Sequence, residues 1–589
     1  MNNKLLPIIF GAFLIAIGII LLNSDWFNGI LQTLYSTLRG GSLDSSVIVR
    51  LGYNSLWYGS LALFFSILIV TRLQNVFSRI LNEKFLLIFA ALLVIISYMY
   101  FMITCKSATI DGERFWWLID DEMISMRYAR NFISGLGLVW NPGERVEGYS
   151  NFLWTIYMSV VHLFVKASSK TSLIILLTNI TLIACTIPVI IRLCHLFKSN
   201  SFVIYGSVLG FVLNINVMGC CLDGFEAVLL SFLFMLSVYR TIKESQDDQV
   251  NLITYLIIGA ISLVRADAVV LSALLYALSF LLNKNRRTVF LYIGLSLLIP
   301  LAHFIFRIIY YGDILPSTAY LKTMNWSGKY IVGLKYVLSF LSHYGLLVVL
   351  VVIGTALSRR KDIILLIIGF FLYSIYIAYI GGDAFIDYRF FMPFIPLLMI
   401  LGFQGIQHLT SGRSAGVIIV SILLLMSLPV HTPYTFAQDR QPEKCNIENI
   451  KLGLLIKNNT PEDCTVADFW AGSVFYFSER YGIDFLGKVD PHIAKLPVVS
   501  DGTLPGHNKF DFDYSLGIFK PDLVIANFSL PVSEEKMKQL STGNPAFTGR
   551  LYFNRIFQEH YFENPVNIKT WRTIFIRDES PLCSLRTLR

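Results

Sequence analysis

Charged residues are scarce in this sequence: Asp, Glu, Lys and Arg make up 15% of its 589 residues, against 55% hydrophobic residues. Together with a mean hydropathy of +0.61, this places the composition outside the range of soluble globular chains. The chain also lacks the patterns GxxxxGKS/T and HExxH, and the pair Gly381-Gly382 is too short to cradle a phosphate. Nucleotide-driven and zinc-peptidase chemistry are therefore disfavoured.

Cysteine motifs and repeats are absent as well. The eight Cys residues show neither CxxC nor metal-ligand spacing. Five of them lie in or beside apolar segments, where we interpret them as small hydrophobic side chains: Cys105, Cys185, Cys194, Cys220 and Cys221. Cys445, Cys464 and Cys583 lie in the polar tail, where an oxidising compartment would permit one disulfide, although the spacing predicts no pairing. The lack of an internal repeat weakens the case for a transporter built from paired halves.

The net charge of +9 would suit a nucleic-acid partner, but the Lys and Arg residues are scattered among short loops between apolar segments. Membrane topology explains this distribution better, because short loops rich in Lys and Arg stay in the cytoplasm. We therefore expect membrane lipids and no nucleic acid as partners. The basic loops that serve as fixed points lie at 72–84, 192–198, 240–243, 284–287 and 359–361.

Long apolar runs occupy most of the chain up to residue 431, and as helices they can cross a hydrocarbon core of about 30 Å. With the basic loops inside, about thirteen crossings are expected, near residues 5–22, 55–71, 85–103, 171–192, 202–218, 226–240, 253–264, 267–282, 288–306, 333–355, 362–380, 391–407 and 415–431. The stretch 151–165 would invert every later loop if it crossed, so we expect an interfacial helix there. The alternative is an ordinary spanning helix.

An odd number of crossings places residues 432–589 outside the cell, as a domain large enough for one core. Within it, CTVADF and PDLVIANF are typical of short strands and SEEKMKQLS of a helix. The expected fold is therefore a polytopic α-helical membrane domain over 1–431 and an extracytoplasmic α/β domain over 432–589. Acceptor binding is a candidate role for the second domain.

Most remaining polar groups fall in loops assigned to the outer face: Asp120, Asp121, the segment 141–151, Asp223, Glu226, Arg265, Asp267, Asp313, Lys322, Asp383, Asp387 and Arg389. Charges at the ends of apolar helices are costly unless they pair or line a polar cavity. We therefore expect a polar cavity at the outer face.

The adjacent carboxylates of Asp120 and Asp121 follow the aromatic run FWWL. They are common as favourable charges at the start of a helix, which is the simpler interpretation. In a low-dielectric setting, however, two close carboxylates raise each other's proton affinity, which suits one of them to act as a general base.

Arg127 and Arg130 lie three residues apart on the helix expected to begin at Asp121, where they could clamp a phosphate or form local salt bridges. The turn-rich segment NPGERVEGYSN offers groups that sugar binding uses, although it would also serve as a plain loop. Its candidates are Arg145, Glu147, Tyr149 and Asn151.

Arg265 and Asp267 interrupt a long apolar run and divide it into two crossings or a broken helix. A structural ion pair is the alternative to a binding role. Lys322, Asp383 and Arg389 repeat the pattern of an apolar helix that runs into charged and aromatic residues, which favours the cavity interpretation.

The block DDEMISMRYARNFISGLGLVWNPGERVEGYSNFLW resembles the signature of the terminal β-(1→2)-arabinofuranosyltransferase-like branch of the GT-C membrane glycosyltransferases, which use polyprenyl-phosphate sugars. FRIIYYGDILPSTAYLK, GGDAFIDYRFFMPFIP, FLGKVDPHIAK and PGHNKFDFDY are similar to later blocks of that branch. The resemblance implies an inverting GT-C enzyme with its catalytic Asp in the first large outer loop, about 104–150. That Asp is Asp120 or Asp121 here. Two crossings precede the helix before this loop, which departs from the simplest GT-C layout.

The implied reaction uses Asp120 as the base and Asp121 as its supporting partner. The resemblance does not identify the acceptor, which we expect to be an envelope glycan, glycolipid or glycoprotein at the outer face of a bacterial cytoplasmic membrane. The leaving phosphate needs a counter-charge, from a cation among Arg127, Arg130, Arg265, Lys322 and Arg389, or from a divalent metal with Asp223, Glu226 and Asp383 as oxygen ligands. A transporter or flippase of lipid-linked sugars is the alternative, as is a structural envelope subunit. Transport would require polar groups through the depth of the bilayer.

Overall fold

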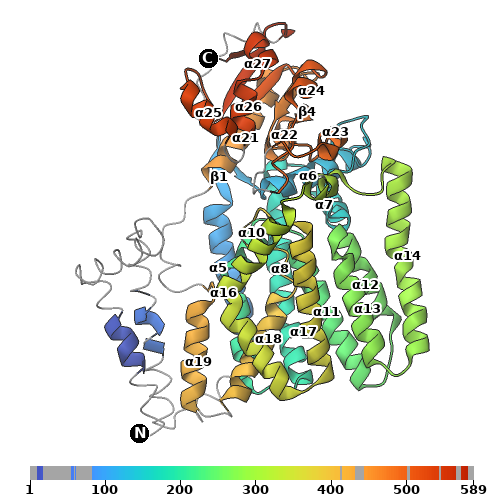
Figure 1. Ribbon diagram of the computed structural model, residues 1–589, viewed down its shortest axis with the longest axis vertical. Helices are drawn as coiled ribbons and strands as arrows, with labels where there is room; N and C mark the ends of the chain where they lie inside the picture. The colour runs from blue at the N-terminus through green and yellow to red at the C-terminus, as the bar shows by residue number, and fades with distance from the viewer. Residues whose placement is uncertain are drawn as a thin grey trace.

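A computed structural model of the chain shows a helical bundle with a smaller α/β part at one end (Figure 1). The structure describes residues 10–17, 53, 55–58, 60–61, 83–324, 326–385, 387–410, 414–430, 443–499, 505–542, 546–564 and 572–581. The crossings expected at 5–22 and 55–71 lie mostly outside the described residues, and Cys583 lies wholly outside them.

Apolar helices form the bundle, because runs that are apolar on every face suit lipid outside and neighbouring helices inside. Five described helices are long and apolar enough to cross a membrane: α5 (Glu83–Cys105), α8 (Ser168–Leu196), α14 (Arg286–Tyr311), α16 (Lys329–Ser358) and α17 (Lys361–Ile380). The others are α9 (Ser201–Val212), α11 (Ala227–Gln246), α12 (Leu252–Val264), α13 (Val269–Leu282), α18 (Ile395–Leu409) and α19 (Ser414–Ser427). The protein is a polytopic α-helical membrane protein, and the count of thirteen crossings stays a prediction.

Two breaks in the apolar runs shape the end of the bundle nearest the α/β part. The single helix expected at 202–218 is wrong: α9 ends at Val212, and α10 (Ile215–Leu222) follows. The cause is Asn214, whose side chain accepts hydrogen bonds from the first amides of α10 and so starts a new helix. The second break was expected. Arg265 is extended, and the 3-10 turn η1 (Ala266–Ala268) separates α12 from α13.

The basic loops gather at the end of the bundle away from the α/β part. Arg360, before α17, donates a hydrogen bond to the carbonyl oxygen of Leu196 at the end of α8 (3.0 Å). Lys361 donates to the carbonyl oxygen of Leu281 at the end of α13 (2.8 Å). Loops that the charge pattern assigned to one side of a membrane therefore lie together in the fold.

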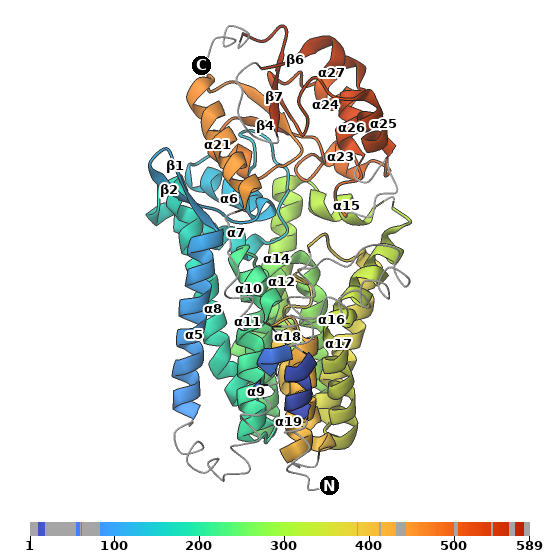
Figure 2. The same cartoon turned by 90° about the vertical axis from the view of Figure 1, so that its left-hand side faces the viewer.

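A layer of short elements lies between the bundle and the α/β part (Figure 2). It contains β1 (Ser107–Ile110), β2 (Glu113–Trp116), α6 (Asp120–Ile133), α7 (Phe152–Phe164) and α15 (Ser317–Thr323). The 13 residues of α7 span only about 20 Å, which is too short to cross a membrane alone. Its interfacial position stays a prediction.

The C-terminal part is a small α/β domain with a five-stranded sheet in the order β4-β3-β5-β7-β6. Strand β3 is parallel to β4 and β5, whereas β7 is antiparallel to β5 and β6. The strands are β3 (Thr465–Asp468), β4 (Tyr481–Asp484), β5 (Leu523–Ala526), β6 (Tyr561–Glu563) and β7 (Thr573–Arg577). The helices are α21 (Lys444–Asn459), α22 (Ser473–Ser478), α23 (Pro491–Lys495), α24 (Phe512–Gly517), α25 (Glu534–Thr542), α26 (Phe547–Tyr552) and α27 (Arg555–His560). The predicted strands contain β3 and β5, and the predicted helix is α25.

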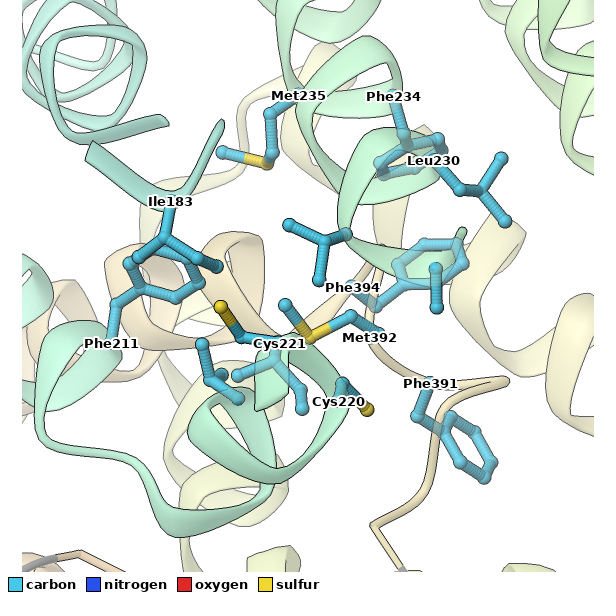
Figure 3. Close-up of a cluster of buried hydrophobic side chains, with 14 of the residues drawn as sticks. Ile183, Phe211, Cys220, Cys221, Leu230, Phe234, Met235, Phe391, Met392 and Phe394 are labelled. Carbon is cyan, nitrogen blue, oxygen red and sulfur yellow. The ribbon is translucent and has the colours of Figure 1, made fainter. Parts of the chain in front are cut away.

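Hydrophobic packing joins the α/β domain to the layer beneath it. Trp140 packs edge-on against Phe475 of α22, with ring centroids 4.8 Å apart, and Tyr128 of α6 belongs to the same buried cluster. Inside the bundle, Cys220 and Cys221 lie among apolar side chains, as expected for small hydrophobic residues (Figure 3). The docked domain thus has a fixed position over the end of the bundle.

Candidate active site

A cavity of about 370 Å³ lies where the bundle, the intermediate layer and the α/β domain meet. Its walls come from α6, the loop 148–151, the break between α12 and α13, α15, the loop after α17, and two segments of the α/β domain. The ionisable residues that line it are Asp121, Glu122, Glu226, Arg265, Asp267, Lys322, Arg389, Lys488 and His507. The charges predicted from the sequence in five separate loops therefore meet at one site.

The two adjacent Asp residues separate at the start of α6. The helix begins at Asp120, one residue earlier than expected, and successive helical side chains point about 100° apart. The carboxylate of Asp120 accepts hydrogen bonds from the amides of Gly472 (3.1 Å) and Ser473 (2.8 Å). A Cβ atom on Gly472 would lie 2.0 Å from the Asp120 carbonyl oxygen, so only glycine permits this approach. Asp121 lines the cavity instead.

This geometry differs from the expectation that Asp120 is the base and Asp121 its supporting partner. Backbone amides of the α/β domain hold the carboxylate of Asp120. The side chain of Asp120 contacts the α/β domain and is absent from the cavity lining in the described residues. Asp121 is therefore the better placed carboxylate for chemistry in the cavity.

Three cations surround Asp121. The Nζ atom of Lys488 lies 2.7 Å from its Oδ1 atom, and Lys322 and Arg389 line the same cavity. Asp383, buried behind them, pairs with Arg389 (Nη2 to Oδ1, 3.0 Å) and lies 3.8 Å from the Nζ atom of Lys322. We call these five residues the cationic group; its three cations and two carboxylates give a net charge of +1.

The charges in the cationic group keep Asp121 ionised. Burial alone would raise the pKa of Asp121, but the charges of Lys488, Lys322 and Arg389, with the hydrogen bond from Lys488, hold it well below its usual range. Burial lowers the pKa of Lys322, and the neighbouring Asp383 offsets part of that effect. Such a group of partly buried cations favours binding of an anion.

A second set of charges lines the cavity. Asn151 donates hydrogen bonds to Glu122 (3.1 Å) and to Glu226 (3.4 Å), which precedes α11. Arg265 pairs with Asp267 through two hydrogen bonds (3.0 and 3.1 Å) and approaches Glu226 at 3.4 Å. We call these five residues the carboxylate group. Burial, and then the charge of Glu226, raise the pKa of Glu122, which favours the protonated form of Glu122.

Arg127 and Arg130 face away from the cavity, and neither expected role is found. Arg127 is buried and donates hydrogen bonds to the carbonyl oxygens of Trp140 (2.7 Å), Phe475 (3.1 Å) and Arg480 (2.8 Å). Arg130 donates to the carbonyl oxygen of Tyr476 (2.6 Å). Both side chains therefore hold the α/β domain on α6, where they neither clamp a phosphate nor pair with the acidic start of the helix.

The segment 145–151 divides between structural and cavity positions. Glu147 is buried in an ion pair with Arg307 of α14 (3.1 Å), and Arg145 is exposed and stacks over Tyr310 at 4.8 Å. Neither lines the cavity, so their expected sugar-binding role has no support from their position. Tyr149 and Asn151 do line it.

The three candidate metal ligands do not converge. Asp223 pairs with Lys106 (2.6 Å), Glu226 with Arg265, and Asp383 with Arg389, so each has its own cationic partner. No group of three or more His, Cys, Asp or Glu side chains suited to a metal ion occurs in the described residues.

Several cavity residues were not singled out from the sequence. Lys488 and His507 belong to the tail blocks FLGKVDPHIAK and PGHNKFDFDY, so their presence in similar blocks was the available signal. Glu122 is a third such residue. Its pairing with Glu226 depends on the packing of α6 beside the start of α11, for which the sequence gives no separate signal.

The fold and the cavity define a polytopic membrane protein with a polar site beneath a docked α/β domain. Residues 437–563 match a family described as a domain of unknown function (DUF8728). The terminal β-(1→2)-arabinofuranosyltransferase of Corynebacterium glutamicum is 24% identical over 369 residues, which are 56% of this chain and 53% of that protein. The protein of the same name from Mycobacterium tuberculosis is 25% identical over 248 residues, 40% of this chain and 39% of that protein. These matches confirm the resemblance to that branch, and the chain spans about half or less of each relative.

Two solved structures are similar at lower identity. The Archaeoglobus fulgidus oligosaccharyltransferase AglB, in complex with an inhibitory peptide and a dolichol-phosphate, is 10% identical with a TM-score of 0.48, over 84% of this chain and 74% of that one. ArnT from Cupriavidus metallidurans, bound to undecaprenyl phosphate, is 9% identical with a TM-score of 0.48, over 85% of this chain and 99% of that one.

Proposed function

We propose that the protein is a membrane glycosyltransferase that moves a sugar from a polyprenyl-phosphate donor to an envelope glycan, glycolipid or glycoprotein. One observation carries the proposal: a single cavity at the end of the bundle joins the ionised Asp121 to a cationic group of net charge +1. A lipid phosphate at the membrane boundary is an anion suited to these cations. The names of the arabinofuranosyltransferase relatives support a pentosyl donor, and a hexosyl donor is the alternative.

Asp121 is the proposed general base. It takes the proton of the acceptor hydroxyl while that oxygen attacks the anomeric carbon from the face opposite the phosphate. The bond from the anomeric carbon to the phosphate oxygen breaks, the polyprenyl phosphate leaves with the bonding electrons, and the configuration inverts. Lys322, Arg389 and Lys488 stabilise the charge on the leaving phosphate.

Donor binding would also activate this base. In the structure, Lys488 donates its hydrogen bond to Asp121, which holds the carboxylate as a weak base. A phosphate in the cavity competes for Lys488 and neutralises nearby positive charge. The pKa of Asp121 then rises, so proton transfer becomes more favourable once donor is present.

The basic loops support an orientation for this reaction. They lie at the opposite end of the bundle from the cavity, and under the positive-inside rule this supports a cavity and an α/β domain outside the cytoplasm. We propose a bacterial cytoplasmic membrane as the location. The site then faces away from cytoplasmic nucleotide sugars, which favours a lipid-linked donor.

The test uses the purified full-length protein in lipid nanodiscs, with envelope glycan fragments as acceptors. Undecaprenyl-phosphate-linked pentoses and hexoses are compared with the corresponding nucleotide sugars, and transferred sugar is detected by chromatography. We expect transfer from a lipid-linked donor alone, with an inverted anomeric centre by NMR. Efficient transfer from a nucleotide sugar, with none from any lipid-linked donor, would contradict the proposal.

A further inference from the structure

We infer that the carboxylate group binds the hydroxyl groups of the donor sugar and thereby selects which glycosylated lipid the protein uses. The group comprises Glu122, Asn151, Glu226, Arg265 and Asp267. This inference rests on the proposed function, because it takes the lipid phosphate to lie at the cationic group in the same cavity.

The carboxylate group and the cationic group differ in net charge and therefore suit different ligands. The carboxylate group has three carboxylates and one guanidinium, so its net charge is −2 when all are ionised and −1 when Glu122 is protonated. A phosphate is repelled from such a group and attracted to the cationic group of net charge +1. A neutral sugar hydroxyl suffers no repulsion and gains charge-assisted hydrogen bonds from the carboxylates.

An unpaired donor in the group points to the same ligand. Arg265 lines the cavity and is 4% exposed, and its buried Nη1 atom has no hydrogen-bond partner in the described part of the chain. A buried donor left unpaired is costly, by roughly 1 to 3 kcal/mol in typical cases. A hydroxyl oxygen can accept a bond from Arg265 while its proton is donated to Glu226, which lies 3.4 Å from that guanidinium.

The group is also held in place before any ligand arrives. The guanidinium of Arg265 lies over the ring of Phe390 at 4.1 Å and is fixed by two hydrogen bonds to Asp267. Asn151 is fixed by the hydroxyl of Ser125, which donates to its Oδ1 atom (2.8 Å). The aromatic rings of Phe390 and Phe385 line the same cavity and offer apolar surface to a sugar ring. Such preorganisation favours discrimination among sugars that differ in one hydroxyl.

The experiment compares two probes on the full-length protein: undecaprenyl phosphate, and undecaprenyl phosphate carrying each of a panel of pentoses and hexoses. The dissociation constant of undecaprenyl phosphate divided by that of the glycosylated lipid isolates the contribution of the sugar. For the preferred sugar, we expect Glu226→Gln to reduce this ratio roughly 10- to 100-fold and to leave the affinity for undecaprenyl phosphate unchanged within about threefold. Binding of the unglycosylated lipid also reports that the variant is folded.

Two further variants sharpen the test. Arg265→Lys keeps the charge beside Asp267 but removes Nη1, so it should also reduce the ratio about tenfold or more. The matched control is Glu244→Gln, a second buried glutamate near the opposite end of α11, which should leave the ratio unchanged.

The inference is overturned if both Glu226→Gln and Arg265→Lys weaken the two probes equally or leave the ratio intact. It is also overturned if the wild-type protein binds no glycosylated lipid more tightly than undecaprenyl phosphate. The proposed function fails separately: preferential binding without transfer would refute transferase activity and keep the sugar site, whereas transfer with an unaltered ratio would refute the sugar site alone.

Discussion

Replacing Asp121 with asparagine should slow transfer and at the same time strengthen binding of the lipid phosphate. Asparagine keeps the shape of the side chain but cannot accept the hydroxyl proton. Loss of a general base typically costs about a hundredfold to ten-thousandfold in rate, so turnover by Asp121→Asn should fall by that factor. A residue that merely shapes the cavity would not change rate and affinity in opposite directions.

The gain in affinity follows from the charges around Asp121. Its carboxylate lies 2.7 Å from the Nζ atom of Lys488, and its removal changes the net charge of the cationic group from +1 to +2. Two like charges about 6 Å apart repel by about 3 kcal/mol at an effective dielectric constant of about 20. That value is an upper limit, because the Asp121 side chain is 26% exposed to screening by water. We expect undecaprenyl phosphate to bind roughly tenfold more tightly.

The assay pairs steady-state transfer with equilibrium binding of undecaprenyl phosphate, each at several salt concentrations. The affinity gain should shrink as salt increases, because it is electrostatic. Asp248→Asn is the matched control, since it makes the same chemical change at an exposed residue that pairs with Lys284, outside the cavity. An Asp121→Asn protein that turned over like wild type, or bound the lipid phosphate more weakly, would refute the assigned role.

Three other predictions concern stability and topology. Asp120→Asn should lower the free energy of unfolding by roughly 1 to 3 kcal/mol, because a neutral amide accepts the Gly472 and Ser473 hydrogen bonds less strongly than a carboxylate. Calorimetry measures this loss, and an unchanged melting temperature would contradict it. Burial lowers the pKa of His507 from 6.5 to about 4, so its neutral form supports stability fully above about pH 6.5 and that support declines as pH falls towards 4. His507→Phe should flatten the stability curve in this range, and an unaltered curve would count against the shift. A cysteine at Arg145 should react only with reagents added outside intact cells and one at Arg286 only after permeabilisation, and the reverse pattern would invert the proposed topology.

The helical fold could be predicted because apolar runs act locally. Each run from residue 85 onward forms helix, since lipid and neighbouring helices both accept apolar surface. The break at Arg265 was visible for the same reason, because a charge inside an apolar run is costly. The break at Asn214 was missed, because a lone polar residue in such a run is also compatible with a continuous helix.

The cavity could be predicted only in part, because its chemistry depends on contacts between distant segments. The expected membrane topology places several charged loops at one end of the bundle, so the sequence predicted that Asp121, Arg265, Lys322 and Arg389 lie close together. The sequence did not predict the partner of Asp121, since Lys488 lies 367 residues further along in another domain. No local pattern reports such a contact.

Some residues that resembled catalytic groups instead assemble the site. Arg127 binds backbone carbonyls of the α/β domain, and Asp120 binds backbone amides of the same domain. Because Lys488 reaches Asp121 from that domain, these docking contacts fix the cation beside the proposed base. Substitution of Arg127 would leave several buried carbonyls unpaired and loosen the domain, so transfer should fail although no cavity residue has changed. The charges at the start of α6 thus serve chemistry on one face and assembly on the other, and both faces are needed for one active site.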